Sequence, residues 1–139
     1  MELGDYCTGI QHIGIPTDDM DKTVSFYQSI GFREALGTVN EKEHARVEFL
    51  QNGNLMLETY ESKNVSRKTG AIDHFCIDVR DIKKVYEYLK SHGFQMLETE
   101  IQFLPFWEHG VQFINILGPN GEKIEFSQKL WLCKVNMKE

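Results

Sequence analysis

The chain has 139 residues, 41% of them hydrophobic, and a formal net charge of −6 at pH 7. This length suits one domain or two small modules sharing a core, and the negative charge argues against a nucleic-acid partner. No apolar run approaches the roughly 20 residues that cross a bilayer, so no membrane partner is expected. The first residues lack the features of a secretory signal, and the three cysteines have no metal or redox spacing, so we expect a cytoplasmic protein.

An internal repeat organises the chain. When residues 9–34 are moved by 62 positions they fall on residues 71–96, and His12 then coincides with His74 and Asp19 with Asp81. A repeat of this period predicts two copies of one supersecondary unit. The coinciding histidines predict a single site to which both copies contribute.

The first copy begins with an alternating run at 9–16 that predicts a strand. An amphipathic helix follows, with Asp18 or Asp19 as its N-cap and Gly31 at its end. A turn signal at 52–53 separates two further strands. The strands expected after this helix are at 33–38, 45–50 and 55–60.

The second copy repeats this order, with a strand at 71–79 and a helix capped by Asp81 that ends at Gly93. Three strands follow, at 95–100, 111–117 and 123–128. The sequence therefore predicts an α+β fold of two tandem βαβββ modules. The expected parts are an N-terminal extension (1–8), the first module (9–60), a polar linker (61–70), the second module (71–128) and a C-terminal tail (129–139). Because the tail contains Leu130, Trp131 and Leu132, we expect it to pack against another surface.

Strand alternation brings two histidines and two glutamates to the faces that the helices do not cover. These are His12 and Glu58 in the first copy and His74 and Glu125 in the second. Two imidazoles and two carboxylates suit a borderline divalent ion such as Ni²⁺, Co²⁺, Zn²⁺ or Mn²⁺. Four such ligands leave room for substrate, on which the ion acts as a Lewis acid. We therefore predict one divalent ion per site, held by these four residues.

Four other side chains are expected to contact a small-molecule substrate. Met56 and Tyr60 flank Glu58 on the same strand face. Phe106 and Trp107 belong to an aromatic, proline-containing stretch that predicts a rigid loop. That loop suits either a wall of the substrate site or a seal at an interface between modules or chains.

Three motifs resemble the vicinal oxygen chelate superfamily, which includes glyoxalase I and the bleomycin-resistance proteins. They are IQHIGI at 10–15, SFY at 25–27 followed by IGF at 30–32, and GPNGEKIEF at 118–126. The resemblance covers residues 9–128. It implies that the paired modules curl into a cup-shaped, half-barrel mixed sheet with helices outside and a metal at its centre. By position, the residues that match the ligands of glyoxalase I-like members are His12, Glu58, His74 and Glu125.

The resemblance to glyoxalase I implies isomerisation of a glutathione hemithioacetal to a thioester through an enediolate. Glu125 would then be the base that takes a proton beside the carbonyl, and Glu58 the second mobile carboxylate. The chain departs from glyoxalase I at Pro16 and Ser62, where related sequences carry an arginine and an asparagine that commonly help to grip glutathione.

Methylmalonyl-CoA epimerase offers an alternative resemblance, since its strand before the second ligand also tends to carry a glutamate and Glu48 stands there. If Val47 and Phe49 face the helix, Glu48 lies in the cup as a further catalytic candidate. The turn at 52–53 decides the pairing: a two-residue turn pairs Glu58 with Val47, and a three-residue loop pairs it with Glu48.

The sequence is also compatible with other functions. An epimerase or isomerase acting on a sugar or keto acid needs the same parts, and a bleomycin-resistance type of protein would bind a small molecule without catalysis. Superfamily members commonly form homodimers, either with each site inside one chain or with modules exchanged so that two chains share a site. Both arrangements are compatible with the sequence.

Overall fold

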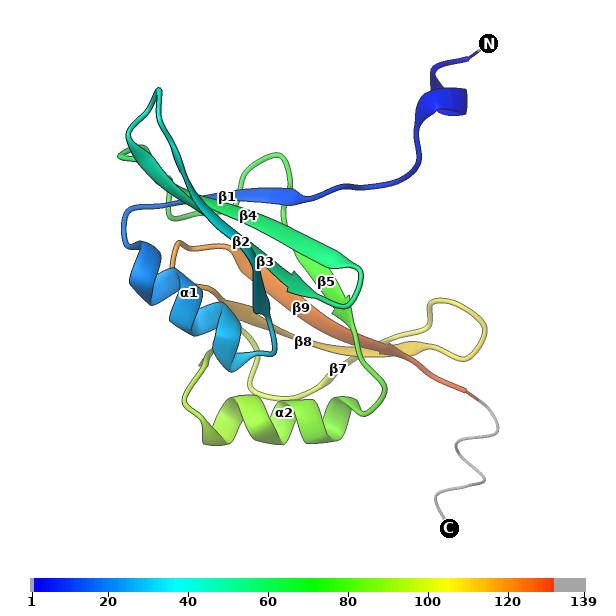
Figure 1. The fold of residues 1–139 in the computed structure, drawn as a ribbon. Helices are drawn as coiled ribbons and strands as arrows, with labels where there is room; N and C mark the ends of the chain where they lie inside the picture. The colour runs from blue at the N-terminus through cyan, green and yellow to red at the C-terminus, as the bar shows by residue number, and fades with distance from the viewer. Residues whose placement is uncertain (1, 132–139) are drawn as a thin grey trace. The chain divides into compact units, whose positions relative to one another are not determined.

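The computed structural model describes residues 2–131 and divides into two compact units, the first ending at Val65 and the second beginning at Ser66 (Figure 1). Each unit contains one sheet and one α-helix of ten residues. Within the described part of the chain, no helix is long and apolar enough to cross a membrane. Of the expected C-terminal tail, residues 132–139 lie outside the described residues, and Trp131 is 59% exposed.

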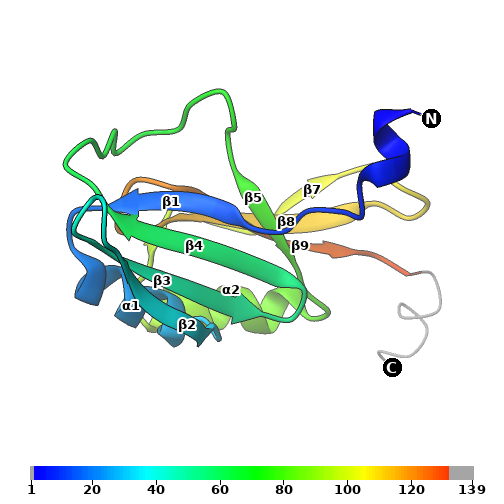
Figure 2. The ribbon, with the colours of Figure 1, turned by 45° about the horizontal axis from the view of Figure 1, so that its top comes forward.

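The first unit has the strand order β1-β4-β3-β2 (Figure 2). The β1 and β4 strands are parallel, and the other neighbours are antiparallel. A short 3₁₀ helix, η1 (Leu3–Tyr6), precedes the sheet. The remaining elements are β1 (Ile13–Thr17), α1 (Met20–Ser29), β2 (Arg33–Asn40), β3 (Ala45–Asn52) and β4 (Leu55–Glu61).

The α1 helix begins where the sequence predicts. The Asp19 side chain accepts a hydrogen bond from the Lys22 backbone N–H, which satisfies one of the free donors of the first turn. One side of α1 covers β3 and β4, and Tyr27, Leu50 and Leu57 are fully buried between helix and sheet. Burial of a large apolar side chain contributes about 1.5–3 kcal/mol, so this layer holds β4 in place beneath the site.

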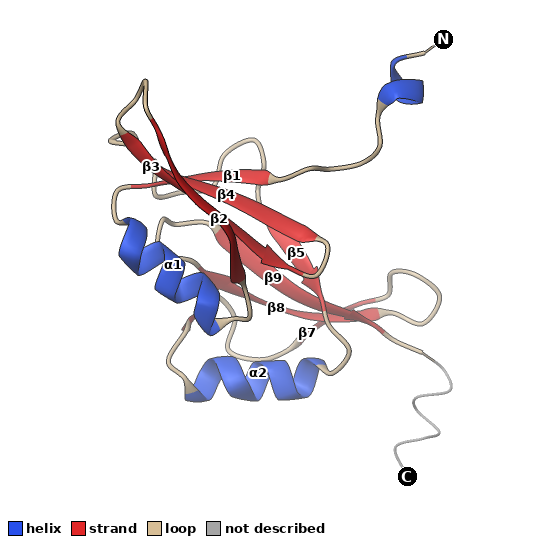
Figure 3. Ribbon diagram, viewed as in Figure 1, coloured by secondary structure: helices blue, strands red, loops and turns tan. Residues whose placement is uncertain are grey.

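The second unit has the same topology, with the order β5-β9-β8-β6 and with β7 also paired to β8. Asp81 caps its helix as Asp19 caps the first, by accepting from the Lys84 N–H. In each unit the helix covers one face of its own sheet (Figure 3). The elements are β5 (Phe75–Asp78), α2 (Ile82–Ser91), β6 (Gln95–Met96), β7 (Gln102–Leu104), β8 (Val111–Leu117) and β9 (Lys123–Lys129).

One expected strand is interrupted. The sequence predicts a single strand at 95–100, but only Gln95 and Met96 form β6, and pairing with β8 resumes at β7. The cause is the Glu98 side chain, which accepts hydrogen bonds from the Asn115 backbone N–H (2.8 Å) and from its Nδ2 (2.7 Å). This carboxylate occupies the β8 donor that a continuous strand would use.

The two first strands are shorter than predicted. They begin at Ile13 and Phe75, so Ile10 and Ile72 lie outside them and are 74% and 81% exposed. The fold class is nevertheless the predicted one, because each unit follows the βαβββ order within an α+β architecture. In the second unit the third element of that order is divided between β6 and β7.

Candidate metal centre

The first unit brings His12 and Glu58 together. His12 directly precedes β1, and Gly14, two residues later, pairs with Glu58 on the parallel strand β4. Side chains two residues apart on a strand point to the same face. The His12 Nε2 atom consequently lies 3.4 Å from Glu58 Oε1, while its Nδ1 atom lies 2.9 Å from Gln11 Oε1.

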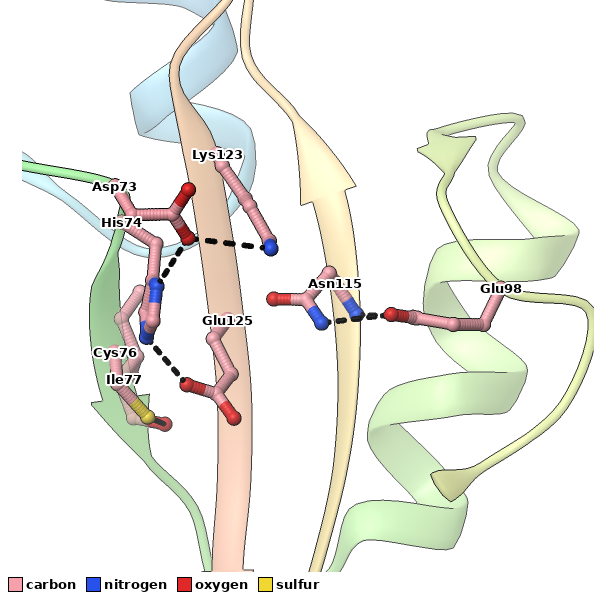
Figure 4. A network of polar contacts seen from close by, with 8 residues as sticks. All are labelled: Asp73, His74, Cys76, Ile77, Glu98, Asn115, Lys123 and Glu125. Carbon is pink, nitrogen blue, oxygen red and sulfur yellow. Dashed lines mark hydrogen bonds and ion pairs between the residues drawn. The ribbon is translucent and has the colours of Figure 1, made fainter. Parts of the chain in front are cut away.

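The second unit repeats this arrangement with His74 and Glu125. His74 precedes β5, and Cys76, two residues later, pairs with Glu125 on β9. The His74 Nε2 atom lies 3.1 Å from Glu125 Oε1, and its Nδ1 atom lies 2.8 Å from Asp73 Oδ2 (Figure 4). Lys123 Nζ also contacts Asp73 Oδ2, at 3.3 Å.

In both units the side chain of the preceding residue contacts the Nδ1 atom of the histidine ring. An oxygen acceptor at Nδ1 favours the tautomer with its proton on Nδ1. The Nε2 lone pair then faces a carboxylate at 3.1–3.4 Å. The Nε2 lone pair and the carboxylate oxygen repel each other at this distance unless a positive charge lies between them. That charge is either a proton on Nε2 or a metal ion. The donor chemistry of each pair therefore fits a divalent metal.

The partners of Nδ1 are not the same in the two units. Gln11 is neutral, whereas Asp73 is a carboxylate, and the hydrogen bonds from His74 and then Lys123 hold the pKa of Asp73 below its usual range. Sequence reasoning missed both residues, although they coincide in the repeat and each directly precedes a histidine. Their position directly before the two histidines could have identified them as partners of the imidazole rings.

Neither unit alone offers a complete ligand set. Among residues 2–131, no three side chains of His, Cys, Asp or Glu gather in a way that could hold a metal ion. Each unit brings together one imidazole and one carboxylate.

The register of the β3–β4 hairpin corrects the expectation for Glu48. The turn residues are Gly53 and Asn54, not Asn52 and Gly53, and Glu58 pairs with Phe49. Gly53 has φ 61°, which suits the first central position of a hairpin turn that favours glycine. Because opposite residues of an antiparallel pair share a face, Phe49 lies on the side of Glu58.

Glu48 consequently faces the helix side of the sheet, together with its partner Thr59. The Phe49 ring stands edge-on to the His12 ring, with centroids 5.7 Å apart, in the place where Glu48 was expected. The prediction that Glu48 shares a face with Glu58 is therefore wrong.

Glu48 instead belongs to a polar cluster on the helix side. Its side chain is 9% exposed, and Arg46 Nε lies 3.6 Å from its Oε2 atom. A Cβ atom at Gly37, the residue opposite on β2, would displace the Glu34 carboxylate and meet Glu48 Oε2 at 3.0 Å, so these carboxylates lie close to the β2 backbone. Burial, followed by the neighbouring Glu34, raises the pKa of Glu48 above its ordinary value.

This raised pKa gives a pH-dependent expectation for Glu48→Gln. A carboxyl group with a raised folded-state pKa stabilises the fold most below its ordinary value of 4.5 and loses that contribution as pH rises through the raised value. The Oε1 atom of this buried carboxyl group lacks a hydrogen-bond partner among the described residues. We expect Glu48→Gln to increase the free energy of unfolding by about 1 kcal/mol at pH 7 and to leave it nearly unchanged at pH 4.

Urea unfolding at both pH values measures this difference. Glu87→Gln, the same substitution on the exposed side of α2, should change neither value. An equal effect of Glu48→Gln at the two pH values would contradict the assignment.

Two of the expected substrate contacts lie beside Glu58. Tyr60 shares its strand face and lines a hollow of about 360 Å³ with Glu58 and Val47. Met56 is half-buried on the same face but does not line that hollow.

The other two expected contacts belong to the second unit. Phe106 and Trp107 lie in the loop between β7 and β8 and are 55% and 67% exposed. Both line a pocket of about 460 Å³ that also contains His74 and Glu125. This pocket is formed by residues of the second unit alone.

Cys76 lines the same pocket and was not predicted as a site residue. Burial, and then the nearby Glu125, raises the pKa of this thiol to about 12. Without a cation beside it, Cys76 is therefore a neutral thiol near pH 7, a form that is a poor nucleophile.

Comparison with known proteins places this architecture among solved structures. A glyoxalase family protein from Enterococcus faecalis aligns with a TM-score of 0.72 and 20% identity over 86% of this chain and 96% of its own. A glyoxalase family protein from Bacillus cereus gives 0.73 and 15%, over 94% and 100%. The fosfomycin resistance protein FosX from Listeria monocytogenes, complexed with Mn(II) and sulfate, gives 0.69 and 16%, over 93% and 98%. At these identities the likeness shows a shared fold.

No curated protein matches the chain at a significant level. A family model does match, over residues 9–126, which is most of the chain and includes both histidine–glutamate pairs. The chain therefore belongs to the Glyoxalase/Bleomycin resistance protein/Dioxygenase superfamily.

Proposed function

We propose that this protein is a metal-dependent lyase or isomerase of glyoxalase I type, which moves a proton at a carbon next to a carbonyl group. Its ligands for one divalent ion are His12, Glu58, His74 and Glu125. The observation that supports this most strongly is the repeated local geometry, in which each histidine has Nδ1 bound by the preceding side chain and Nε2 directed at a glutamate.

When bound, the divalent ion supplies a Lewis acid that stabilises negative charge on the substrate's carbonyl oxygen. The chain supplies the bases. Glu125 takes the proton from the carbon beside the carbonyl and returns a proton to the neighbouring carbon, and Glu58 is its counterpart in the first unit. Glu125 suits this role because its side chain is only 18% exposed and lies in a pocket with aromatic walls, which limits competition from water.

The test begins with metal-free protein loaded with Mn²⁺, Ni²⁺, Co²⁺ or Zn²⁺ in turn, and assayed with the hemithioacetal of methylglyoxal and glutathione. Mn²⁺ is included because the FosX structure contains Mn(II). We expect turnover with at least one ion and none without metal. Protein that binds no metal after reconstitution would overturn the proposal and favour a protein that only binds a small molecule.

The epimerase alternative loses its main support. Beyond the opening motif at 12–15, it rested on Glu48 as an additional catalytic carboxylate, and the β3–β4 register directs that residue to the helix side. Metal binding together with turnover of a methylmalonyl thioester, but not of the hemithioacetal, would restore it.

Asp73→Asn provides a prediction specific to the second unit. The variant retains an oxygen beside His74 Nδ1 but removes the negative charge that makes the imidazole a stronger ligand. We expect the affinity for Zn²⁺ or Ni²⁺ to fall about 10-fold, as measured by competition with a chromogenic chelator. Asp5→Asn, in the exposed helix η1, is the matched control. An unchanged affinity in Asp73→Asn would remove Asp73 from the metal centre.

We further propose a homodimer. The two arrangements open to it are distinguished by mixing His12→Ala chains with His74→Ala chains, each inactive alone. If modules are exchanged between chains, the mixed dimer contains one intact site and activity returns. If each site lies inside one chain, both sites of the mixed dimer are defective and activity stays absent.

A further inference from the structure

One face of β9 carries a row of four polar side chains, one of which is the proposed metal ligand Glu125. Lys123, Glu125, Ser127 and Lys129 alternate along β9 with the buried residues Ile124, Phe126 and Gln128. All four polar side chains line the pocket of about 460 Å³. Successive members of the row are about 7 Å apart, because a strand rises about 3.3 Å per residue. Lys129 therefore stands at the far end of the pocket, about 13 Å along the strand from Glu125.

The two lysines of this row differ in their partners. Lys123 is neutralised by Asp73, at 3.3 Å. Lys129 has no carboxylate within ion-pair distance among the described residues, and its Nζ lies 3.9 Å from the centre of the Trp107 ring. A cation–π contact positions an ammonium group without cancelling its charge. Lys129 thus presents a positive charge at the end of the row.

The loop that carries Trp107 is fixed in place. The Leu130 N–H, next to Lys129, donates to the Gly110 carbonyl at 2.9 Å and ties the end of the loop to β9. Trp107 has φ 63°, an uncommon value for a residue with a side chain. Lys129 and Trp107 therefore form a preorganised pair.

Between Glu125 and Lys129 the pocket is largely apolar or neutral. Ser127 lies midway on β9, with Phe113 opposite it on β8. Phe106 contributes a second aromatic surface. The acidic group facing this stretch is Asp78, which pairs with Ser127 at the end of β5, whereas Lys129 lies beyond the end of that strand. Negative charge on a ligand is consequently favoured at the Lys129 end and disfavoured near Asp78.

We propose that Lys129 and Trp107 form an anion subsite for an elongated substrate whose carboxylate or phosphate group is remote from its reacting carbon. The reacting end lies at Glu125, the apolar middle lies along Phe106 and Phe113, and the anion lies at Lys129. The identity of the reacting end rests on the proposed function, whereas the anion subsite is measurable without turnover. This chain has Pro16 and Ser62 where related sequences carry an arginine and an asparagine that commonly help to bind glutathione, an anionic thiol. The proposed subsite supplies an anion contact that these two positions lack.

The experiment uses the full chain in metal-free form with Trp131→Phe, which leaves Trp107 as the sole tryptophan. The probes are hexanoate, hexyl phosphate and neutral hexanamide, titrated while Trp107 fluorescence is recorded. We expect at least one anion to bind about 10-fold more tightly than hexanamide. Hexanoate and hexyl phosphate, compared with each other, identify the preferred anion.

Lys129→Met should remove this preference and leave the affinity for hexanamide unchanged. The matched control is Lys90→Met, because Lys90 also lies over an aromatic ring, that of Tyr86 at 5.6 Å, but on α2. The control should retain the preference. Equal binding of all three probes, or an unchanged preference in Lys129→Met, would overturn the subsite. Failure of the hemithioacetal assay with this preference intact would overturn the proposed function alone.

Discussion

Replacing His74 with alanine is expected to lower the affinity for the divalent ion by at least about 100-fold, and His12→Ala should do the same. Loss of a supporting partner of a metal ligand already costs 10–100-fold, and each of these variants loses a ligand itself. Each variant also leaves a glutamate without the imidazole that lies 3.1–3.4 Å from it. Both losses should affect the same ion, because the proposal assigns one ion to both pairs.

Elemental analysis and chelator competition measure this prediction directly. The wild-type chain should bind one ion, and each single variant should lose it at ion concentrations that saturate the wild type. His92→Ala is the matched control, since His92 caps α2 and its Nδ1 contacts the Tyr88 carbonyl. Two ions per wild-type chain with one retained in each variant would instead show two independent sites and contradict the shared centre.

The sequence predicted the histidine–glutamate pairs because two regular periodicities determine them. The 62-residue repeat aligns His12 with His74, and strand alternation puts each histidine on the face of its neighbouring glutamate. The parallel pairing of β1 with β4 and of β5 with β9 then brings each pair within reach. Helix starts were equally predictable, since Asp19 and Asp81 cap by the same side-chain hydrogen bond.

The position of Glu48 was not predictable, because it depends on whether the loop between β3 and β4 has two or three residues. The sequence around the turn contains both Asn52-Gly53 and Gly53-Asn54, and each is a good two-residue turn. The structure uses the two-residue turn Gly53-Asn54. Either two-residue turn puts Val47 and Phe49 on the face of Glu58, whereas a three-residue loop would put Glu48 there. The phenylalanine therefore lies beside the site in place of the glutamate.

The interrupted strand escaped prediction for a different reason. The hydrogen bonds from Asn115 to Glu98 join residues 17 positions apart, and no local pattern reports such a contact. The Lys129–Trp107 contact is also non-local, since a loop and a strand end meet only after the β7–β8 hairpin has formed. Local periodicity thus predicted the framework of the site, whereas tertiary contacts determined its edges.

Glu125→Gln is expected to reduce the turnover rate of the hemithioacetal by about 1,000-fold while lowering metal affinity far less. General acid–base catalysis typically contributes 10²–10⁴-fold, and glutamine keeps an oxygen donor in the place of the carboxylate but cannot accept the substrate proton. The measurements are kcat with saturating metal, and metal affinity by chelator competition on the same preparation. Glu87→Gln, on the exposed side of α2, is the control for an amide substitution within the same unit. A variant that keeps wild-type kcat would remove Glu125 from proton transfer, and Glu58→Gln, measured in parallel, would then identify whether the base belongs to the first unit.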